Sequence, residues 1–219
     1  MRLLITCGPS FEPIDQVRRL TNFSTGELGV SLAEAFSAQG ATVVCLKGQT
    51  ASFRNPNPTV ETHHFTTNDN LYAQLTALSQ TTQFHALLHV AALSDYRVNA
   101  ILDESGNPLQ NGKVPSNLGN LTLQLAPAKK LISELHRLFP NTSIVGWKYE
   151  VDGNAESAVH KGFKQIQQHH THACVVNGPA CGTQLILCRP PKTQTPLQNR
   201  QELVNCLVNW LLPPQPPHS

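Results

Sequence analysis

A strand, a polar loop and a helix open this chain, and they constrain its fold more than any other stretch. Arg2–Cys7 is short, apolar and β-prone, and Gly8–Ser10 ends it. A polar loop is expected over Phe11–Phe23. Apolar residues at helical spacing then predict a helix within Ser24–Gly40, and Thr42–Leu46 predicts a second buried strand. This order of elements is typical of the opening of a βαβ unit.

The start of that helix could hold an anion, because a helix N-terminus presents free N–H groups at the positive end of the helix dipole. Ser24, Thr25 and Gly26 occupy this position, and Gly26 and Gly29 leave room for a ligand and for helix–strand contact. Alternatively, Ser24 and Thr25 only cap the helix, and the loop alone does not decide between the two interpretations. The dinucleotide fingerprint G-x-G-x-x-G is absent after Gly8, which disfavours a plain NAD oxidoreductase.

Composition narrows the class of protein. With 219 residues, 40% of them hydrophobic, the chain suits one domain, or one domain with a flap. A net charge of +2 without any basic run gives nucleic-acid binding little support. No stretch is apolar over a membrane-spanning length and no signal peptide is apparent, so a cytoplasmic protein is expected. The six scattered cysteines predict reduced core residues, and the ten histidines lack ligand spacing, so no metal ligand is predicted.

Strands and helices alternate along the rest of the chain. Further strands are expected at Thr59–Phe65, Ala86–Ala91, Leu121–Leu125, Ser143–Trp147, Ala173–Asn177 and, as an edge strand, Gln184–Cys188. Further helices are expected after a Thr67 cap to about Leu78, over Ala128–Leu138, over Glu156–His169, and from Thr195-Pro196 onward, with Leu203, Cys206, Leu207, Trp210 and Leu211 on the buried face. The sequence therefore predicts an α/β fold: a three-layer, Rossmann-like, mostly parallel sheet with helices on both faces and ligands at the carboxyl ends of its strands.

Two later stretches carry candidate site residues. Ala91 and Ala92 follow a buried strand and would let a ligand approach the backbone, while Asp95 offers a carboxylate; the alternative is an ordinary strand–loop junction with a capping Asp. The turn-rich segment Asp103–Asn120 predicts a surface flap. It holds Lys113, which in isolation is interpreted as a solvated lysine.

Three ordered motifs together resemble the phosphopantothenate–cysteine ligase family of coenzyme A biosynthesis. They are Ile5–Arg18, Thr21–Gly26 with the following Gly29, and Ala91–Arg97. Similarity continues through Gly146–Lys148 and Val175–Asn177 and so covers nearly the whole chain. The resemblance implies one ligase-like domain over residues 1–212 with a flap at about 97–120 and a Pro-rich tail over 213–219. The chain length is similar to that of the stand-alone bacterial form, which implies that no FMN is bound.

The family's reaction has two steps. A nucleoside triphosphate, CTP in bacteria, activates the phosphopantothenate carboxylate as an acyl-nucleotidylate and releases pyrophosphate. The amine of L-cysteine then displaces the nucleoside monophosphate. The resemblance implies Mg²⁺ bound with CTP (or ATP), small-molecule substrates, and a homodimer.

The family's motifs assign roles to residues of this chain. The implied nucleotide-binding residues are Gly8, Ser24, Gly26, Gly29, Lys113, Trp147, Lys161 and Asn177. The implied phosphopantothenate-binding residues are Arg18, Asn22, Ala91, Ala92 and Asp95. Asn22 and Lys113 would be catalytic, with Lys113 stabilising charge at the α-phosphate. Arg18 would reach the phosphopantothenate bound by the partner subunit.

The sequence departs from the family at Pro115, at Ala128-Lys129-Lys130 and at Gly178. These departures leave a catalytically silent binding paralogue as an alternative. An NADP oxidoreductase of similar fold is a third possibility, against which the missing glycine fingerprint and the lack of a Tyr-x-x-x-Lys pair count.

Overall fold

A mixed sheet of eight strands forms the centre of the molecule. This computed structural model describes residues 1–109 and 112–212, so the expected Pro-rich tail lies outside the described residues. The strands lie in the order β12-β11-β10-β9-β6-β1-β4-β5. They span Arg2–Cys7 (β1), Thr42–Gly48 (β4), Glu61–Phe65 (β5), Ala86–His89 (β6), Ser143–Tyr149 (β9), Ala173–Asn177 (β10), Leu185–Arg189 (β11) and Thr193–Leu197 (β12). Every neighbouring pair from β10 to β5 is parallel, and β11 and β12 are antiparallel additions.

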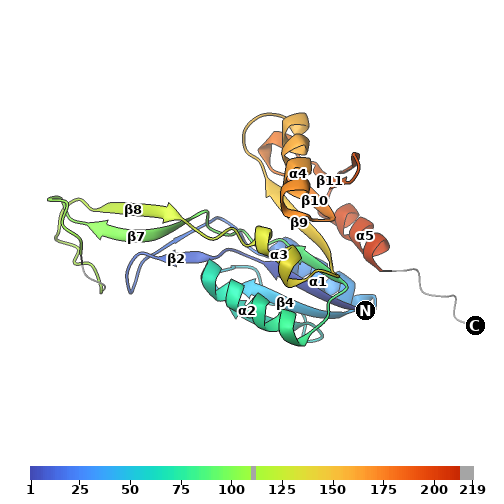
Figure 1. Cartoon of the computed structure of the whole chain (residues 1–219), viewed down its shortest axis with the longest axis horizontal. Coiled ribbons are helices and arrows are strands. Elements are labelled where there is room, and N and C mark those ends of the chain that lie inside the picture. The colour runs from blue at the N-terminus through green and yellow to red at the C-terminus, as the bar shows by residue number, and fades with distance from the viewer. Residues whose placement is uncertain (110–111, 213–219) are drawn as a thin grey trace, which may run out of the picture.

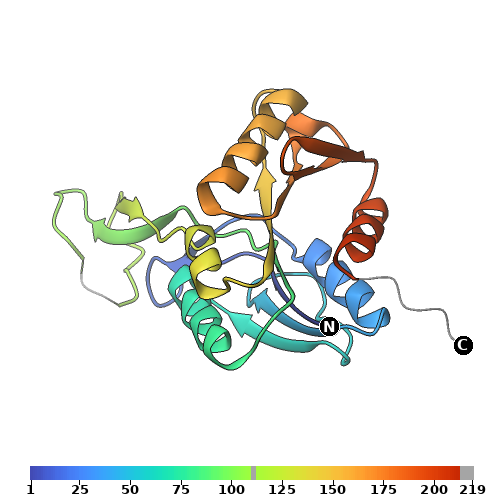
Figure 2. The ribbon, with the colours of Figure 1, turned by 45° about the vertical axis from the view of Figure 1, so that its right-hand side comes forward.

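Helices cover both faces, because successive side chains of a strand point to opposite sides. Leu3 and Ile5 pack in one core with helices α1 (Glu27–Ala38) and α5 (Arg200–Leu211). Leu4, between them, packs in a second core with α2 (Asn68–Thr81) and α3 (Ile132–Leu138). Helix α4 (Ala155–His169) covers β10 and β11 on the side of α2 and α3 (Figure 2). The three-layer α/β fold predicted from the sequence is confirmed.

The direction of strand order reverses at β1. From β1 the chain adds β4 and then β5 on one side, and it returns to place β6 on the other side of β1. A reversal of this kind leaves a crevice at the carboxyl ends of the two central strands. Gly8 follows β1 and Ala91 lies just beyond β6, so the glycine loop and the Ala-Ala motif meet at this crevice. Beyond the named strands, Pro9 and Ala92 still form a parallel bridge.

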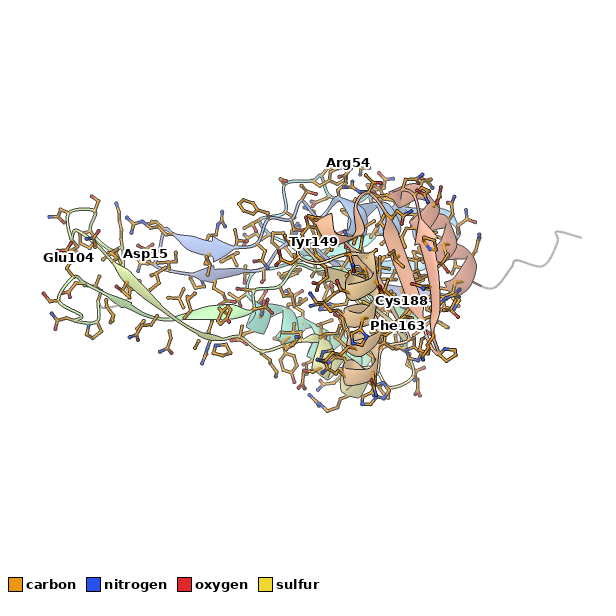
Figure 3. All side chains as sticks on the ribbon, turned by 90° about the horizontal axis from the view of Figure 1, so that it is seen from above. Asp15, Arg54, Glu104, Tyr149, Phe163 and Cys188 are labelled. Atoms are coloured by element: carbon orange, nitrogen blue, oxygen red, sulfur yellow. The ribbon has the colours of Figure 1, made fainter. Side chains whose placement is uncertain are left out.

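Two hairpins extend beyond the sheet in the same direction (Figure 1). The first pairs β2 (Phe11–Pro13) with β3 (Arg19–Thr21), and the second pairs β7 (Tyr96–Leu102) with β8 (Thr122–Pro127). We call them the short arm and the long arm. Figure 3 shows Asp15 and Glu104 toward their far ends. One prediction is corrected here, because the expected loop Phe11–Phe23 contains a hairpin. The strand expected at Leu121–Leu125 is confirmed as β8, and it lies in an arm. Period-two alternation does not say which sheet a strand joins.

Three expectations for elements in the second half of the chain were wrong. Thr195 and Pro196 do not start a helix, because they lie in strand β12 at the edge of the sheet, where Pro is tolerated. Since β12 pairs with β11, β11 is not the edge strand that was expected. The last helix instead begins after Asn199, whose side chain accepts a hydrogen bond from the Glu202 N–H at 2.9 Å. Helix α3 begins at Ile132 rather than Ala128. The Thr67 cap is confirmed by its 3.1 Å hydrogen bond from Asn70 N–H.

Candidate active site

A cavity of about 1420 Å³ opens at the carboxyl ends of β1, β6, β9 and β10 and reaches the first residues of α5. Ten residues singled out in the sequence line it: Gly8, Asn22, Ser24, Gly26, Gly29, Ala91, Ala92, Asp95, Trp147 and Asn177. The structure thus brings together residues that lie up to 169 positions apart in the chain (177 − 8). The individual roles given to them stay predictions.

Close packing of α1 on β1 forms the glycine-lined end of the cavity. A Cβ added at Gly29 would lie 2.1 Å from the Cβ of Cys7, so no larger residue fits between helix and strand. Gly8 and Gly26 have φ angles of 77° and 80°, a left-handed conformation that favours glycine. Gly26 caps α1 without any side-chain cap bond, and Thr25 Oγ1 accepts only the Glu27 N–H, at 3.2 Å. The helix N-terminus therefore offers backbone donors toward the cavity.

The loop after β6 is held from both sides by asparagine amides. Asn22 Nδ2 donates to the carbonyl of Leu93 at 2.9 Å and to that of Ala92 at 3.4 Å. Asn68 Nδ2 donates to the Ser94 carbonyl at 2.8 Å. These contacts fix which end of the Asn22 amide faces the backbone, so its Oδ1 remains an acceptor.

Trp147 and His89 line the inner part of the cavity. The indole of Trp147 is half-buried, and its Nε1–H has no partner among the residues that the structure describes. His89 is buried, with Nδ1 at 2.8 Å from Thr6 Oγ1. Burial lowers the pKa of His89 to about 4, so this imidazole is neutral near pH 7.

Three predicted site residues do not line the cavity. Arg18 and Lys113 lie at the far ends of the arms, where Arg18 Nη1 donates to Asp15 Oδ2 at 2.6 Å and to the Val114 carbonyl at 3.1 Å. Lys161 on α4 forms an ion pair with Glu150. The roles predicted for these three residues require a movement or a second subunit.

Opposing effects set the pKa of Glu150. Desolvation raises the pKa of this carboxyl, but the Lys161 and Lys148 ammonium groups outweigh it and hold the pKa below its usual range. Glu150 therefore remains a carboxylate at neutral pH, and Lys161 is paired with it.

One wall of the cavity was not predicted from the sequence. It is formed by residues 183–185 and 198–200. Arg200 forms an ion pair with Glu27, which joins the first turns of α5 and α1. A signal for this wall was present in the sequence, because Asn199 followed three residues later by Glu202 is a helix-start signature. The exposed Phe23 also lines the cavity and was not singled out.

The charges of the cavity suit an anionic ligand. Four cationic side chains line it (Lys129, Lys130, Lys148 and Arg200), against two carboxylates (Glu27 and Asp95). No group of three metal-ligating side chains occurs within the described ranges. Mg²⁺ is compatible with such a cavity, since this ion takes one or two carboxylates and completes its shell with water and substrate phosphates.

A doubly wound sheet with a helix N-terminus and a cationic cavity at its switch point is typical of the class of α/β proteins that bind phosphate-bearing ligands. Residues 1–184 match the family model of the DNA/pantothenate metabolism flavoprotein C-terminal domain. The chain belongs to this family, and the resemblance inferred from its motifs is confirmed at this level. None of the helices in residues 1–109 and 112–212 has the length and apolarity needed to span a bilayer.

A curated relative and two solved structures are similar to this chain, the structures in fold. The chain is 29% identical over 181 residues to the coenzyme A biosynthesis bifunctional protein CoaBC of Thermococcus kodakarensis, covering 80% of this chain but only 41% of that protein. The DNA/pantothenate metabolism flavoprotein from Streptococcus pneumoniae has the same fold, with a TM-score of 0.84 at 24% identity, covering 96% of this chain and 97% of that one. A Cab2 mutant in complex with phosphopantothenate-cysteine gives a TM-score of 0.71 at 19% identity, covering 94% and 84%.

Proposed function

We propose that this chain ligates phosphopantothenate to L-cysteine at the expense of a nucleoside triphosphate, with CTP as the expected nucleotide. The observation that carries this proposal is the convergence of the three sequence motifs on one cationic cavity. The family membership and the CoaBC relative support a place in coenzyme A biosynthesis.

The nucleotide would bind with its phosphates at the N-terminus of α1, near Gly8 and Gly26, where backbone N–H groups compensate negative charge. Trp147 would pack against the base, and its unpartnered Nε1–H is available as a donor. Asn177 would contact the nucleotide from the end of β10. Mg²⁺ bound with the nucleotide would neutralise part of the phosphate charge, with Glu27 and Asp95 as the carboxylates that line the cavity.

Phosphopantothenate would bind beside Ala91 and Ala92, which lack bulk, with Asn22 and Asp95 as polar partners. Its carboxylate oxygen attacks the α-phosphorus, the bond from that phosphorus to the pyrophosphate oxygen breaks, and an acyl-nucleotidylate forms. The deprotonated amine of cysteine then attacks the acyl carbon and the nucleoside monophosphate leaves. Positioning of two anionic substrates and neutralisation of their charge supply most of the catalysis in such a site.

A homodimer accounts for the residues at the arm tips. Arg18 donates a hydrogen bond to the carbonyl of Val114, the neighbour of Lys113, and both residues donate to Asp15, so the tips of the two arms are joined into one unit. If this unit reaches the cavity of a second subunit, the roles predicted for Arg18 and Lys113 are met together. A fully active monomer would contradict this part of the proposal.

Pyrophosphate release tests the activity. Purified protein is incubated with Mg²⁺ and phosphopantothenate, with CTP or ATP, and phosphopantothenoylcysteine is then sought by mass after cysteine is added. We expect release that depends on phosphopantothenate and is faster with CTP. Release with neither nucleotide, from folded protein that binds phosphopantothenate, would instead favour the silent paralogue that Pro115 and the Ala128–Lys130 departure suggest.

A further inference from the structure

A second, smaller cavity of about 220 Å³ lies at the base of the arms. It shares Asn68 and the segment 127–129 with the large cavity, so the two adjoin. Glu12, Asp69 and Arg97 line only the small one. These residues come from β2, the first turn of α2 and β7, and nothing in the proposed function uses them.

The small cavity is lined by charges of both signs, two carboxylates (Glu12 and Asp69) and two cations (Arg97 and Lys129). Across the described part of the chain, none of Glu12, Asp69 and Arg97 takes part in an ion pair. Glu12 is nevertheless only 9% exposed. Desolvation, helped by Asp69, raises the pKa of the Glu12 carboxyl, while the Asn68 backbone N–H and Arg97 act in the other direction. A carboxylate in this setting is stabilised by any cationic group that enters the cavity.

Asn68 supplies an independent sign that the cavity takes a ligand. Its side chain is almost fully buried, at 3% exposure, and Nδ2 donates to the carbonyls of Ser94 (2.8 Å) and Lys129 (3.4 Å). Those two bonds fix the amide orientation, because a flipped amide would set its oxygen against two carbonyls. Oδ1 is left without a partner in the ranges that the structure describes. An unsatisfied buried acceptor is unfavourable, and a small shift of the Asn68 side chain would let Oδ1 accept from a donor on the ligand.

We infer that the small cavity binds the α-amino acid substrate, L-cysteine, with its ammonium group toward Glu12 and Asn68 Oδ1 and its carboxylate toward Arg97. This inference rests on the proposed function. A zwitterion matches the lining, since acceptors and a guanidinium face one small space and a ligand of single charge would leave one side uncompensated. Asn68 borders both cavities, so the amine would lie where it can approach an acyl group held beside Asn22 in the large one.

Two variants separate this assignment from a structural role. Glu12→Gln should raise the KM for cysteine at least tenfold, the scale of a lost hydrogen bond to a charged group. Pyrophosphate release without cysteine, and the KM for phosphopantothenate, should stay within about twofold. Arg97→Gln should reduce discrimination between cysteine and cysteamine, which lacks the carboxylate, at least tenfold. Glu61→Gln, an exposed carboxylate on β5 outside both cavities, is the matched control.

Direct binding keeps the test independent of turnover. Equilibrium dialysis with radiolabelled L-cysteine, alone and with phosphopantothenate but no nucleotide present, should show retention by the wild-type chain and loss in Glu12→Gln, because no cysteine is consumed without the nucleotide. If the wild-type chain releases no pyrophosphate, the proposed function fails. Dialysis still shows in that case whether the small cavity binds cysteine. The inference is overturned if the wild-type chain retains no cysteine, if Glu12→Gln leaves the cysteine KM unchanged, or if pyrophosphate release falls as much as cysteine use.

Discussion

The cavity end of the sheet and the two arms are positioned by different forces. At the cavity, Gly29 lies directly against Cys7, and the neighbouring strand residues are fully buried. In the long arm most side chains of β8 are exposed. Hydrogen bonds centred on Asp15 hold the arm tips to one another.

This difference leads us to expect a rigid cavity end and arms that can move. Close packing holds the glycine-lined end of the cavity in one geometry, because a packed core does not deform gradually. The arms carry Arg18 and Lys113 on an extended scaffold with little buried apolar surface, which is typical of elements that move. We therefore expect changes in the cavity wall to affect folding and changes in the arms to affect turnover.

Gly29→Ala should give the largest effect. The new Cβ would lie 2.1 Å from the Cys7 Cβ, between a helix and a strand that cannot separate cheaply. We expect a loss of about 3 kcal/mol in the free energy of unfolding, at the upper end for overpacked sites. Urea denaturation measures it. Gly112→Ala in the long arm is the control, since its Cβ would meet nothing within 4 Å; an equal loss in both variants would contradict the comparison.

Lys113→Gln should lower turnover about a hundredfold or more with little change in stability. The reason is the loss of one positive charge from the transition state, equivalent to about 2.7 kcal/mol. Initial rates of pyrophosphate release and a urea denaturation curve measure the two quantities. The control is Lys192→Gln, an exposed lysine between β11 and β12. Unchanged turnover would remove Lys113 from the reaction.

His89 should make the free energy of unfolding fall at acidic pH. Burial lowers its pKa from 6.5 to about 4, so between these values the unfolded chain binds a proton that the folded chain does not. Its contribution to stability is complete above pH 6.5 and is lost as the pH falls toward 4. From pH 7 to pH 5 the loss is about 2 kcal/mol. Urea midpoints of the wild-type chain and His89→Gln measure it, and parallel pH profiles would contradict this role.

Asp15→Asn should have the smallest effect, confined to the arms. Desolvation raises the pKa of Asp15, but the N–H groups of Val17, Val114 and Arg18 and the Arg18 guanidinium outweigh it and set the pKa below its usual value. The Asp15 carboxylate therefore stabilises the folded arm tips at pH values above the ordinary carboxyl pKa. This stabilisation is lost as the pH falls through the lowered pKa of Asp15.

Hydrogen exchange tests this junction. We expect the Val114 amide to exchange up to about tenfold faster in Asp15→Asn, while the midpoint of urea denaturation is unchanged. Asp103→Asn is the control, because Asp103 accepts hydrogen bonds from Ser105 and Asn107 in its own turn. Faster exchange at Val114 in both variants would show that the arm loosens as a whole.

The chain's local patterns determined the layers of the fold and the glycine-lined end of the cavity. Strand and helix periods are local properties, and Gly8, Gly26 and Gly29 act within one βα turn, so adjacent residues sufficed to find them. Ten predicted site residues accordingly line one cavity.

Tertiary structure alone decided the rest. The pairing of Thr193–Leu197 with β11 prevented the helix expected at Thr195. The arms place Lys113 beside Arg18 and away from the cavity, and the small cavity joins Glu12, Asn68 and Arg97. Such contacts link segments far apart in the chain. Their geometry depends on strand order and packing, which period and propensity do not encode.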